Sequence, residues 1–242
     1  MTRKPLPPGR FGLPWLGETL SILRNNHEFY KERLDKYGPI FKTRLFGNSF
    51  VVFSGHEAFH TFAIDERIVR GDADPISAEQ IFMSSLALID GAEHHVRKAV
   101  MLRAVGFRSA IASYLPTMQE LLERTIDPWL ASGTGVDLRA DLQRFAARLT
   151  GALYTGDRSE QHAAELDRNL ADMRDAFMTL PVPIPGTKYG KAIAGRKRID
   201  QIIGDALEKH QSGGYDDIVS RMIAAANDAD VPVEALRGDI RH

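Results

Sequence analysis

The stretch that decides the fold is Asp90-Gly91-Ala92-Glu93-His94-His95-Val96-Arg97-Lys98. It leads into a segment that we predict to be one helix, residues 93–105. His94 and Lys98 are four residues apart, so both side chains project from one face of that helix. Arg97 is next to Lys98 in sequence but lies about 100° away around the helix. We therefore rank Arg97 below Lys98 as a partner for His94.

The chain from residue 93 to 242 has the periodicity of helices almost throughout. Apolar residues recur three or four positions apart, and in any helical domain such stripes pack the core. The run Pro181-Val182-Pro183-Ile184-Pro185-Gly186 breaks the pattern sharply. The stripes run from Ile111 to Trp129, from Leu138 to Leu153, from Leu166 to Phe177 and from Ile199 to Leu207.

The earlier part of the chain is more varied. Residues 1–26 are rich in proline and glycine, and we expect an extended arm there. Residues 27–62 predict a helix, a β hairpin over 40–53 and a short helix. Residues 63–92 show no clean period, and we interpret them as a loop. The predicted fold class is therefore mainly α with a small β hairpin region, in a single partial domain over residues 1–242.

Composition excludes several classes of function. The 242 residues carry a net charge of −1, which gives no argument for a nucleic-acid partner. The absence of cysteine excludes disulfides, Cys-ligated zinc and a thiolate nucleophile. No long apolar run follows the N-terminus, so we expect no signal peptide and no membrane anchor. We expect a soluble, cytoplasmic protein.

Further motifs stand in a fixed order around the stretch from Asp90 to Lys98. They are Pro7-Pro8-Gly9, Tyr37-Gly38-Pro39-Ile40-Phe41 and Ala104-Val105. In this order they resemble the N-terminal half of a cytochrome P450. Leu180 to Thr187 is similar to the loop between the two lid helices in one soluble branch of that family. The resemblance implies the N-terminal portion of the P450 fold, truncated at the start of the long central helix.

The resemblance also implies a haem site. In the family, the residue matched by His94 and the residue matched by Lys98 both reach a haem propionate. The family usually has arginine where this chain has Lys98. A lysine ammonium attracts a propionate as a point charge, whereas an arginine guanidinium can donate two parallel hydrogen bonds to it. P450s hold haem iron through a Cys thiolate, which this chain cannot supply. We therefore expect haem in the intact family member, no stable haem binding by this chain alone, and no catalytic activity.

Four apolar residues are candidates for contact with substrate. Phe82, Leu86 and Leu88 precede the helix over 93–105, in the region that lines the substrate pocket in the family, and Phe177 precedes the proline-rich break. Core packing is an equal alternative for the residues of the loop. The intact relative would be a monooxygenase that acts on an apolar small molecule and receives electrons from a partner protein.

The sequence is compatible with two other kinds of function. The chain could be a non-catalytic binding fragment, or half of a split protein whose C-terminal half is separately encoded. Truncation would leave apolar side chains such as Val100, Leu102 and Leu236 in water.

The run His56-Glu57-Ala58-Phe59-His60 matches the His-Glu-x-x-His pattern of zinc hydrolases. We rank zinc chemistry last, because a third ligand is not obvious.

Overall fold

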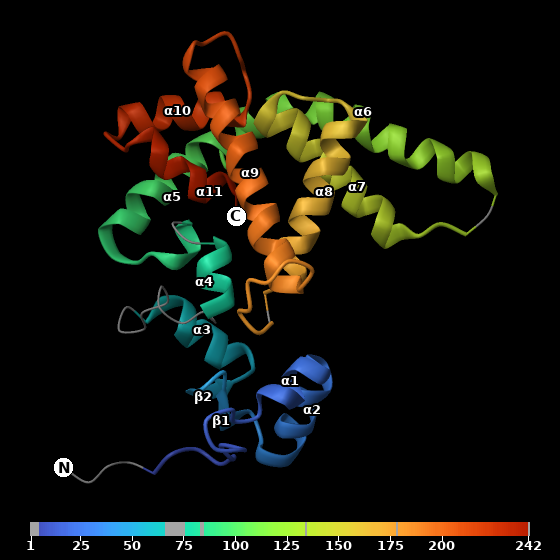
Figure 1. Ribbon diagram of the computed structural model, residues 1–242. Helices are drawn as coiled ribbons and strands as arrows, with labels where there is room; N and C mark the ends of the chain where they lie inside the picture. Colours follow the sequence, from blue (N-terminus) through green and yellow to red (C-terminus); the bar gives the residue numbers. More distant parts are fainter. Residues whose placement is uncertain (1–4, 66–75, 83–84, 134, 178, 242) are drawn as a thin grey trace. The chain divides into compact units, whose positions relative to one another are not determined.

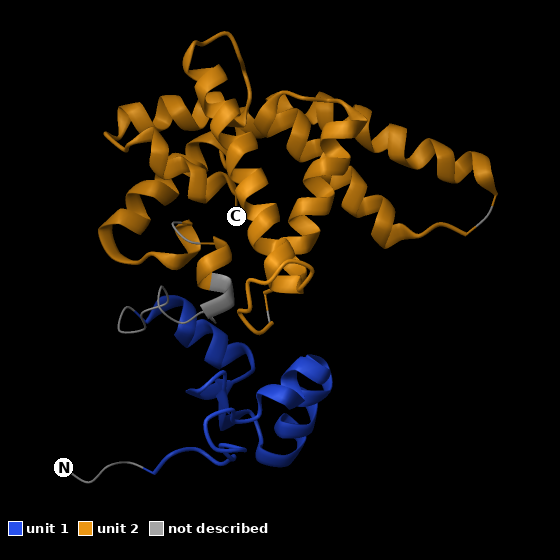
Figure 2. Cartoon of the chain, in the orientation of Figure 1, with its two compact units in different colours: residues 1–69 blue, residues 70–242 orange. Residues whose placement is uncertain are grey.

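The structure is a computed structural model that describes residues 5–65, 76–82, 85–133, 135–177 and 179–241 (Figure 1). The chain divides into two compact units, residues 1–69 and residues 70–242 (Figure 2). The prediction of one partial domain over residues 1–242 stays a prediction, because two clusters of contacts do not decide whether they fold together.

Unit 1 holds the two strands and three of the helices in the described part of the chain. Its elements are α1 (Thr19–Arg24), α2 (Asn26–Tyr37), β1 (Ile40–Leu45), β2 (Asn48–Phe53) and α3 (His56–Ile64). The strands are antiparallel, with Ile40 opposite Phe53 and Leu45 opposite Asn48, so the predicted hairpin is confirmed. Phe46 and Gly47 form the turn with φ of 52° and 84°. Two positive φ values in a two-residue turn match the right-handed twist of the strands.

The prediction of an extended arm over residues 1–26 is wrong at its end, because α1 begins at Thr19. The prolines and positive-φ glycines of this region stop at Gly17. Residues 18–24 contain no proline or glycine, so no residue in this stretch disfavours a helix. The Thr19 hydroxyl donates to the Leu16 carbonyl and accepts from the Phe46 backbone N–H at 2.7 Å, so this end of the arm is tied to the hairpin.

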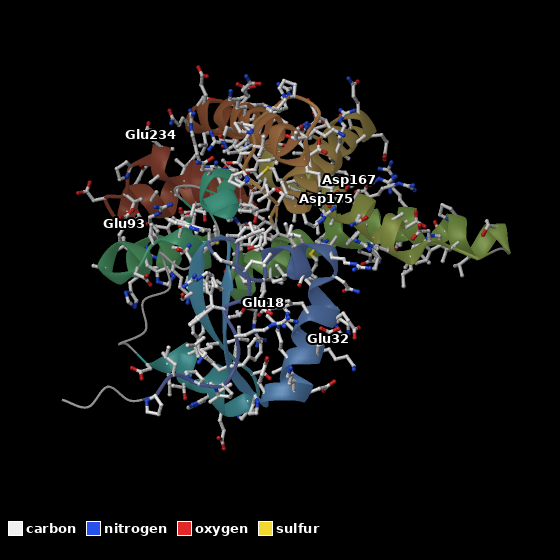
Figure 3. All side chains as sticks on the ribbon, turned by 60° about the horizontal axis from the view of Figure 1, so that its bottom comes forward. Glu18, Glu32, Glu93, Asp167, Asp175 and Glu234 are labelled. Atoms are coloured by element: carbon white, nitrogen blue, oxygen red, sulfur yellow. The ribbon has the colours of Figure 1, made fainter. Side chains whose placement is uncertain are left out.

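A buried carboxylate holds unit 1 together. Glu18, labelled in Figure 3, accepts hydrogen bonds from Arg33 at 2.7 Å, from Arg10 at 2.6 Å and from Thr43 at 2.8 Å. Burial raises the pKa of the Glu18 carboxyl, but these hydrogen bonds lower it by more, so the pKa is about 2. The arm, α2 and β1 therefore each donate a hydrogen bond to the same carboxylate, that of Glu18.

All the regular elements among the described residues of unit 2 are helices or helical turns. Its elements are α4 (Ile76–Phe82), the 3-10 turn η1 (Leu86–Leu88), α5 (Gly91–Val105), α6 (Arg108–Ser132), α7 (Leu138–Thr150), the π-helical turn η2 (Gly151–Thr155), α8 (Glu160–Asp175), α9 (Lys188–Gln211), α10 (Ile218–Asp228), the 3-10 turn η3 (Val233–Ala235) and α11 (Leu236–Arg241). With the hairpin of unit 1, this confirms the predicted fold class of mainly α with a small β region.

Helix α9 lies at the core of unit 2. It contacts α4, α8, α10 and α11 (Figure 1). Its predicted stripe, Ile199, Ile202, Ile203 and Leu207, is buried. Leu236 and Val100 are buried as well, so the expectation that they lie in water is wrong; packing within unit 2 already covers them. Leu102 is exposed, as expected.

The predicted stripe on α6 is covered only in part. The buried positions are Ala110, Tyr114, Leu121 and Thr125, which recur at helical spacing. The neighbouring apolar stripe contains Ile111, Leu115 and Leu122, which are exposed. Leu138 and Leu142 on α7 are exposed in the same way. Helices α6 and α7 therefore present apolar side chains to water.

The network at Glu18 predicts a pH-dependent stability. The folded pKa of about 2 lies below the usual value of 4.5, so the stabilisation is complete above pH 4.5 and is lost as the pH falls toward 2. Glu18→Gln removes the charge and leaves Arg33 buried without its carboxylate, at a cost of about 3 kcal/mol. Amide hydrogen exchange of β1 and β2 at pH 7 measures this loss.

The control is Asp35→Asn, which removes the exposed Lys31–Asp35 pair on α2. That change should alter stability by only about 0.5 kcal/mol. Equal protection of the hairpin in Glu18→Gln and wild-type protein would contradict the role given to Glu18.

Candidate functional site

Helix α5 carries the residues that the sequence singles out. Gly91 opens it with φ of 74°, a backbone conformation that glycine adopts without strain. The helix packs against α6 and α10 and buries Val100 and Ala104. Tyr114 of α6 donates a hydrogen bond to the Ala104 carbonyl at 2.8 Å, which fixes the C-terminal end of α5.

His94 and Lys98 lie at the edge of this buried face. His94 is half-buried, and its ring stands edge-on to that of His95 at a centroid distance of 5.7 Å. Lys98 is exposed, and its ammonium makes no hydrogen bond or ion pair with any described residue. One helical turn therefore presents an imidazole and an uncommitted cation together. These are groups that can bind an anion such as a carboxylate.

Arg97 has a different environment from Lys98. Its guanidinium is buried and donates to both carboxylate oxygens of Asp239, at 2.7 and 3.0 Å. It also donates to Glu93, labelled in Figure 3, at 3.0 Å. Burial lowers the pKa of Arg97, and the hydrogen bond and charge of Asp239 raise it by more. Arg97 is therefore committed within the protein.

Asp239 is a residue that sequence reasoning missed. It lies 142 positions beyond Arg97, so no local spacing links the two. Its carboxylate is almost completely buried, with a side-chain exposure of 1%. The segment Leu236–Arg241 also carries two arginines, so an aspartate there is not unusual and the sequence held no signal that singled out Asp239.

Two of the four predicted substrate contacts, Phe82 and Phe177, lie close together. The rings of Phe82 and Phe177 are 6.2 Å apart between centroids. Phe82 ends α4, which is held on α9 by hydrogen bonds from Tyr189 and Arg196 to Gln80. An aromatic pair thus joins α4 to the segment that follows α8.

Leu86 and Leu88 lie on η1, which contacts α5, and both are half-buried. Unit 2 has a cavity of about 440 Å³ between α9 and the η3–α11 segment, and a smaller one of about 180 Å³ beside η2. Neither cavity is lined by Phe82, Leu86, Leu88 or Phe177. Their contact with substrate stays a prediction.

The residues of the zinc pattern lie on α3. The rings of His56 and His60 are 6.4 Å apart between centroids, and Glu57 is exposed. Among the residues that the structure describes, no group of three His, Asp or Glu side chains could hold a metal ion. The geometry therefore gives no support to a zinc hydrolase.

No helix in the described part of the chain has the length and apolar character needed to cross a bilayer.

Comparison with known proteins identifies relatives over nearly the whole chain. The putative cytochrome P450 120 of Synechocystis sp. (strain ATCC 27184 / PCC 6803 / Kazusa) is 30% identical over 234 residues, which are 95% of this chain and 51% of the relative. Abscisic acid 8'-hydroxylase 1 of Oryza sativa subsp. japonica is 27% identical over 206 residues, which are 84% of this chain and 43% of the relative. The chain thus spans about half the length of these relatives.

The fold has a solved counterpart. The structure of retinoic acid-bound cyanobacterial CYP120A1 superposes with a TM-score of 0.84 at 28% sequence identity, covering 98% of this chain and 55% of that chain. The family model described as Cytochrome P450 matches residues 7–221. The resemblance inferred from the motifs around His94 is confirmed, and this chain belongs to the cytochrome P450 family.

Proposed function

We propose that this chain is the N-terminal half of a haem monooxygenase, in which His94 and Lys98 contact a haem propionate. The observation that carries the proposal is the exposed, uncommitted Lys98 ammonium one turn from His94. The neighbouring cation, Arg97, is neutralised by Asp239. A propionate approaching this face of α5 therefore meets one available cation and one imidazole.

These residues fit one part of haem and not another. Charge-assisted hydrogen bonds from an ammonium suit a propionate. Iron ligation by a thiolate, which in this family favours O–O cleavage, needs a cysteine, and the chain has none. We therefore propose that these 242 residues bind haem only weakly and have no monooxygenase activity by themselves.

We propose an apolar small molecule as the substrate of the complete enzyme. The rice relative is named for abscisic acid, and the solved cyanobacterial relative is bound to retinoic acid. Both molecules combine an apolar body with a carboxylic acid, so apolar acids are the class to test first. Phe82, Leu86, Leu88 and Phe177 are the proposed contacts, and an electron-transfer protein is the proposed redox partner.

The uncovered stripes on α6 and α7 support a second polypeptide as a further partner. Ile111 and Leu115 on α6, and Leu138 and Leu142 on α7, are exposed and four residues apart within each helix, and exposed apolar surface can mark interaction sites. The relatives are about twice as long as this chain. We propose that a C-terminal half, separately encoded, covers these stripes. The alternative is a non-catalytic binding fragment, which would not gain activity with such a partner.

Haem binding tests the role of Lys98. Loss of a donor to a charged group costs about 1.5–3 kcal/mol, so Lys98→Ala should weaken the affinity for haemin roughly ten-fold or more. Lys98→Arg should bind as tightly as wild type or more tightly, because a guanidinium can grip a carboxylate with two bonds. Absorbance titration with haemin measures both affinities. Because the chain alone is proposed to bind haem only weakly, gel filtration of the haem-loaded protein should remove most of the haem.

The control for this series is Lys197→Ala, which removes another exposed ammonium, on α9. It should leave haemin affinity unchanged. Equal affinities for wild type, Lys98→Ala and Lys98→Arg would remove the basis of the proposal.

The missing thiolate gives a spectroscopic prediction. After reduction, the haem-loaded chain should show no thiolate-type Soret band with carbon monoxide, because no cysteine is available to donate electron density to iron. The Synechocystis relative, prepared in the same way, serves as the positive control. A thiolate-type band from these 242 residues alone would refute the prediction.

The exposed stripes predict association. Wild-type protein should self-associate as its concentration rises, and Leu115→Gln with Leu142→Gln should reduce this without lowering the thermal midpoint, since both side chains are exposed. Sedimentation velocity at several concentrations measures the effect. A matched control is Leu166→Gln, at a buried position, which should destabilise the fold instead. A wild-type monomer at every concentration would count against the stripes as an interface.

A further inference from the structure

We infer that Asp239 is a positioning residue for the haem-contact face of α5. Through Arg97 it fixes the rotation of this helix, so that His94 and Lys98 point in one set direction. This inference rests on the proposed function, because it takes the face that carries His94 and Lys98 to be the one that meets a propionate.

Arg97 and Asp239 form a bidentate ion pair, the Arg97–Asp239 clamp. Two bonds of 2.7 and 3.0 Å join one guanidinium to one carboxylate, and the side chains are only 5% and 1% exposed. A bidentate pair fixes the relative orientation of its two planes as well as their distance. Arg97 also donates to the Ala235 carbonyl at 3.1 Å, which adds a third point of attachment.

Helical geometry shows why this clamp sets the direction of His94 and Lys98. With 3.6 residues per turn, His94 and Lys98 lie about 60° and 100° to one side of Arg97 around α5. On the other side of Arg97, at about 60° and 20°, lie Val100 and Ala104, both buried. Arg97 therefore lies on the boundary between the packed face of the helix and the proposed propionate face. A rotation of α5 that freed Arg97 would turn both faces.

The support to which α5 is clamped is itself fixed. Helix α11 is held on its other side by an ion pair between Arg241 and Asp200 of α9, at 3.2 Å. Leu236 at its start is completely buried. The short helix thus lies between α5 and α9 and joins the proposed haem-contact helix to the centre of the core.

Stability alone does not explain a pair of this kind. Replacement of a buried ion pair by apolar residues of similar size is often neutral or stabilising, and the best-attested use of such pairs is to fix one arrangement among several. An apolar pair at these positions would fill the space, but it would not define the rotation of α5.

The test separates orientation from stability with three forms of the chain. Asp239→Asn breaks the pair, and the double variant Arg97→Met/Asp239→Leu replaces it by apolar side chains. The control double variant, Arg198→Met/Glu165→Leu, removes an exposed ion pair between α9 and α8. Each is examined by thermal unfolding, by amide hydrogen exchange of α5 and by haemin titration.

Asp239→Asn should speed amide exchange in α5 selectively and weaken haemin binding roughly ten-fold, an effect usual for groups that orient a ligand. The apolar double variant should recover the thermal midpoint but keep the weakened haemin affinity. The control should match wild type in α5 exchange and in haemin binding. Recovery of both stability and haemin affinity in the apolar double variant would overturn the inference, as would wild-type exchange of α5 in Asp239→Asn.

Failure of the proposed function gives a different result. If haemin affinity does not respond to Lys98→Ala, the face does not meet a propionate, whatever Asp239 does. Faster exchange of α5 in Asp239→Asn would then show a clamp that serves packing only. If Lys98→Ala weakens haemin binding and Asp239→Asn does not, the proposed function stands and the positioning role is refuted.

Discussion

Burial of the Arg97 guanidinium is the constraint on which the arrangement of unit 2 around α5 depends. A buried cation needs a carboxylate in contact, since an uncompensated one is strongly destabilising. The exposed Glu93 on the same helix supplies one carboxylate to Arg97, and the buried one comes from Asp239 on α11, 142 residues further along the chain. The first and last parts of unit 2 must therefore come together. The other contacts of α5, the packing of Val100 and the bond from Tyr114, add to an orientation that this pair defines.

Unit 1 also compensates a buried charge, but there the charge is a carboxylate that several donors share. Its buried carboxylate, Glu18, is shared by Arg33, Arg10 and Thr43, so several segments converge on one acceptor. In both units a buried arginine meets a carboxylate on another element. Such pairs contribute less to net stability than to the choice of one arrangement, because desolvation offsets much of their attraction. They make the positions of β1 and α5 definite where apolar packing alone would allow sliding.

Sequence could predict what depends on neighbouring residues. The hairpin follows from alternating residues and a glycine turn, and the pairing of His94 with Lys98 on one face follows from a spacing of four. It could not predict Asp239, whose partner is remote in sequence, nor the helix that begins at Thr19. The stripes of α6 show a further limit. Ala110 and Tyr114 are buried while the more apolar Ile111 and Leu115 are exposed, because burial depends on which elements are present to cover a face.

A division of the family's fold between two chains, as proposed above, would have a consequence for cofactor binding. In the proposed arrangement, propionate contacts lie on this chain, and the iron ligand lies on another. Each part alone would then make too few contacts to hold haem firmly, whereas the assembled pair would make both sets. A ligand that binds only the assembled state stabilises that state by mass action. Haem uptake and association of the halves would therefore be linked, and the orientation of α5 by Asp239 would strengthen both together, because a preformed face loses less freedom when its ligand arrives.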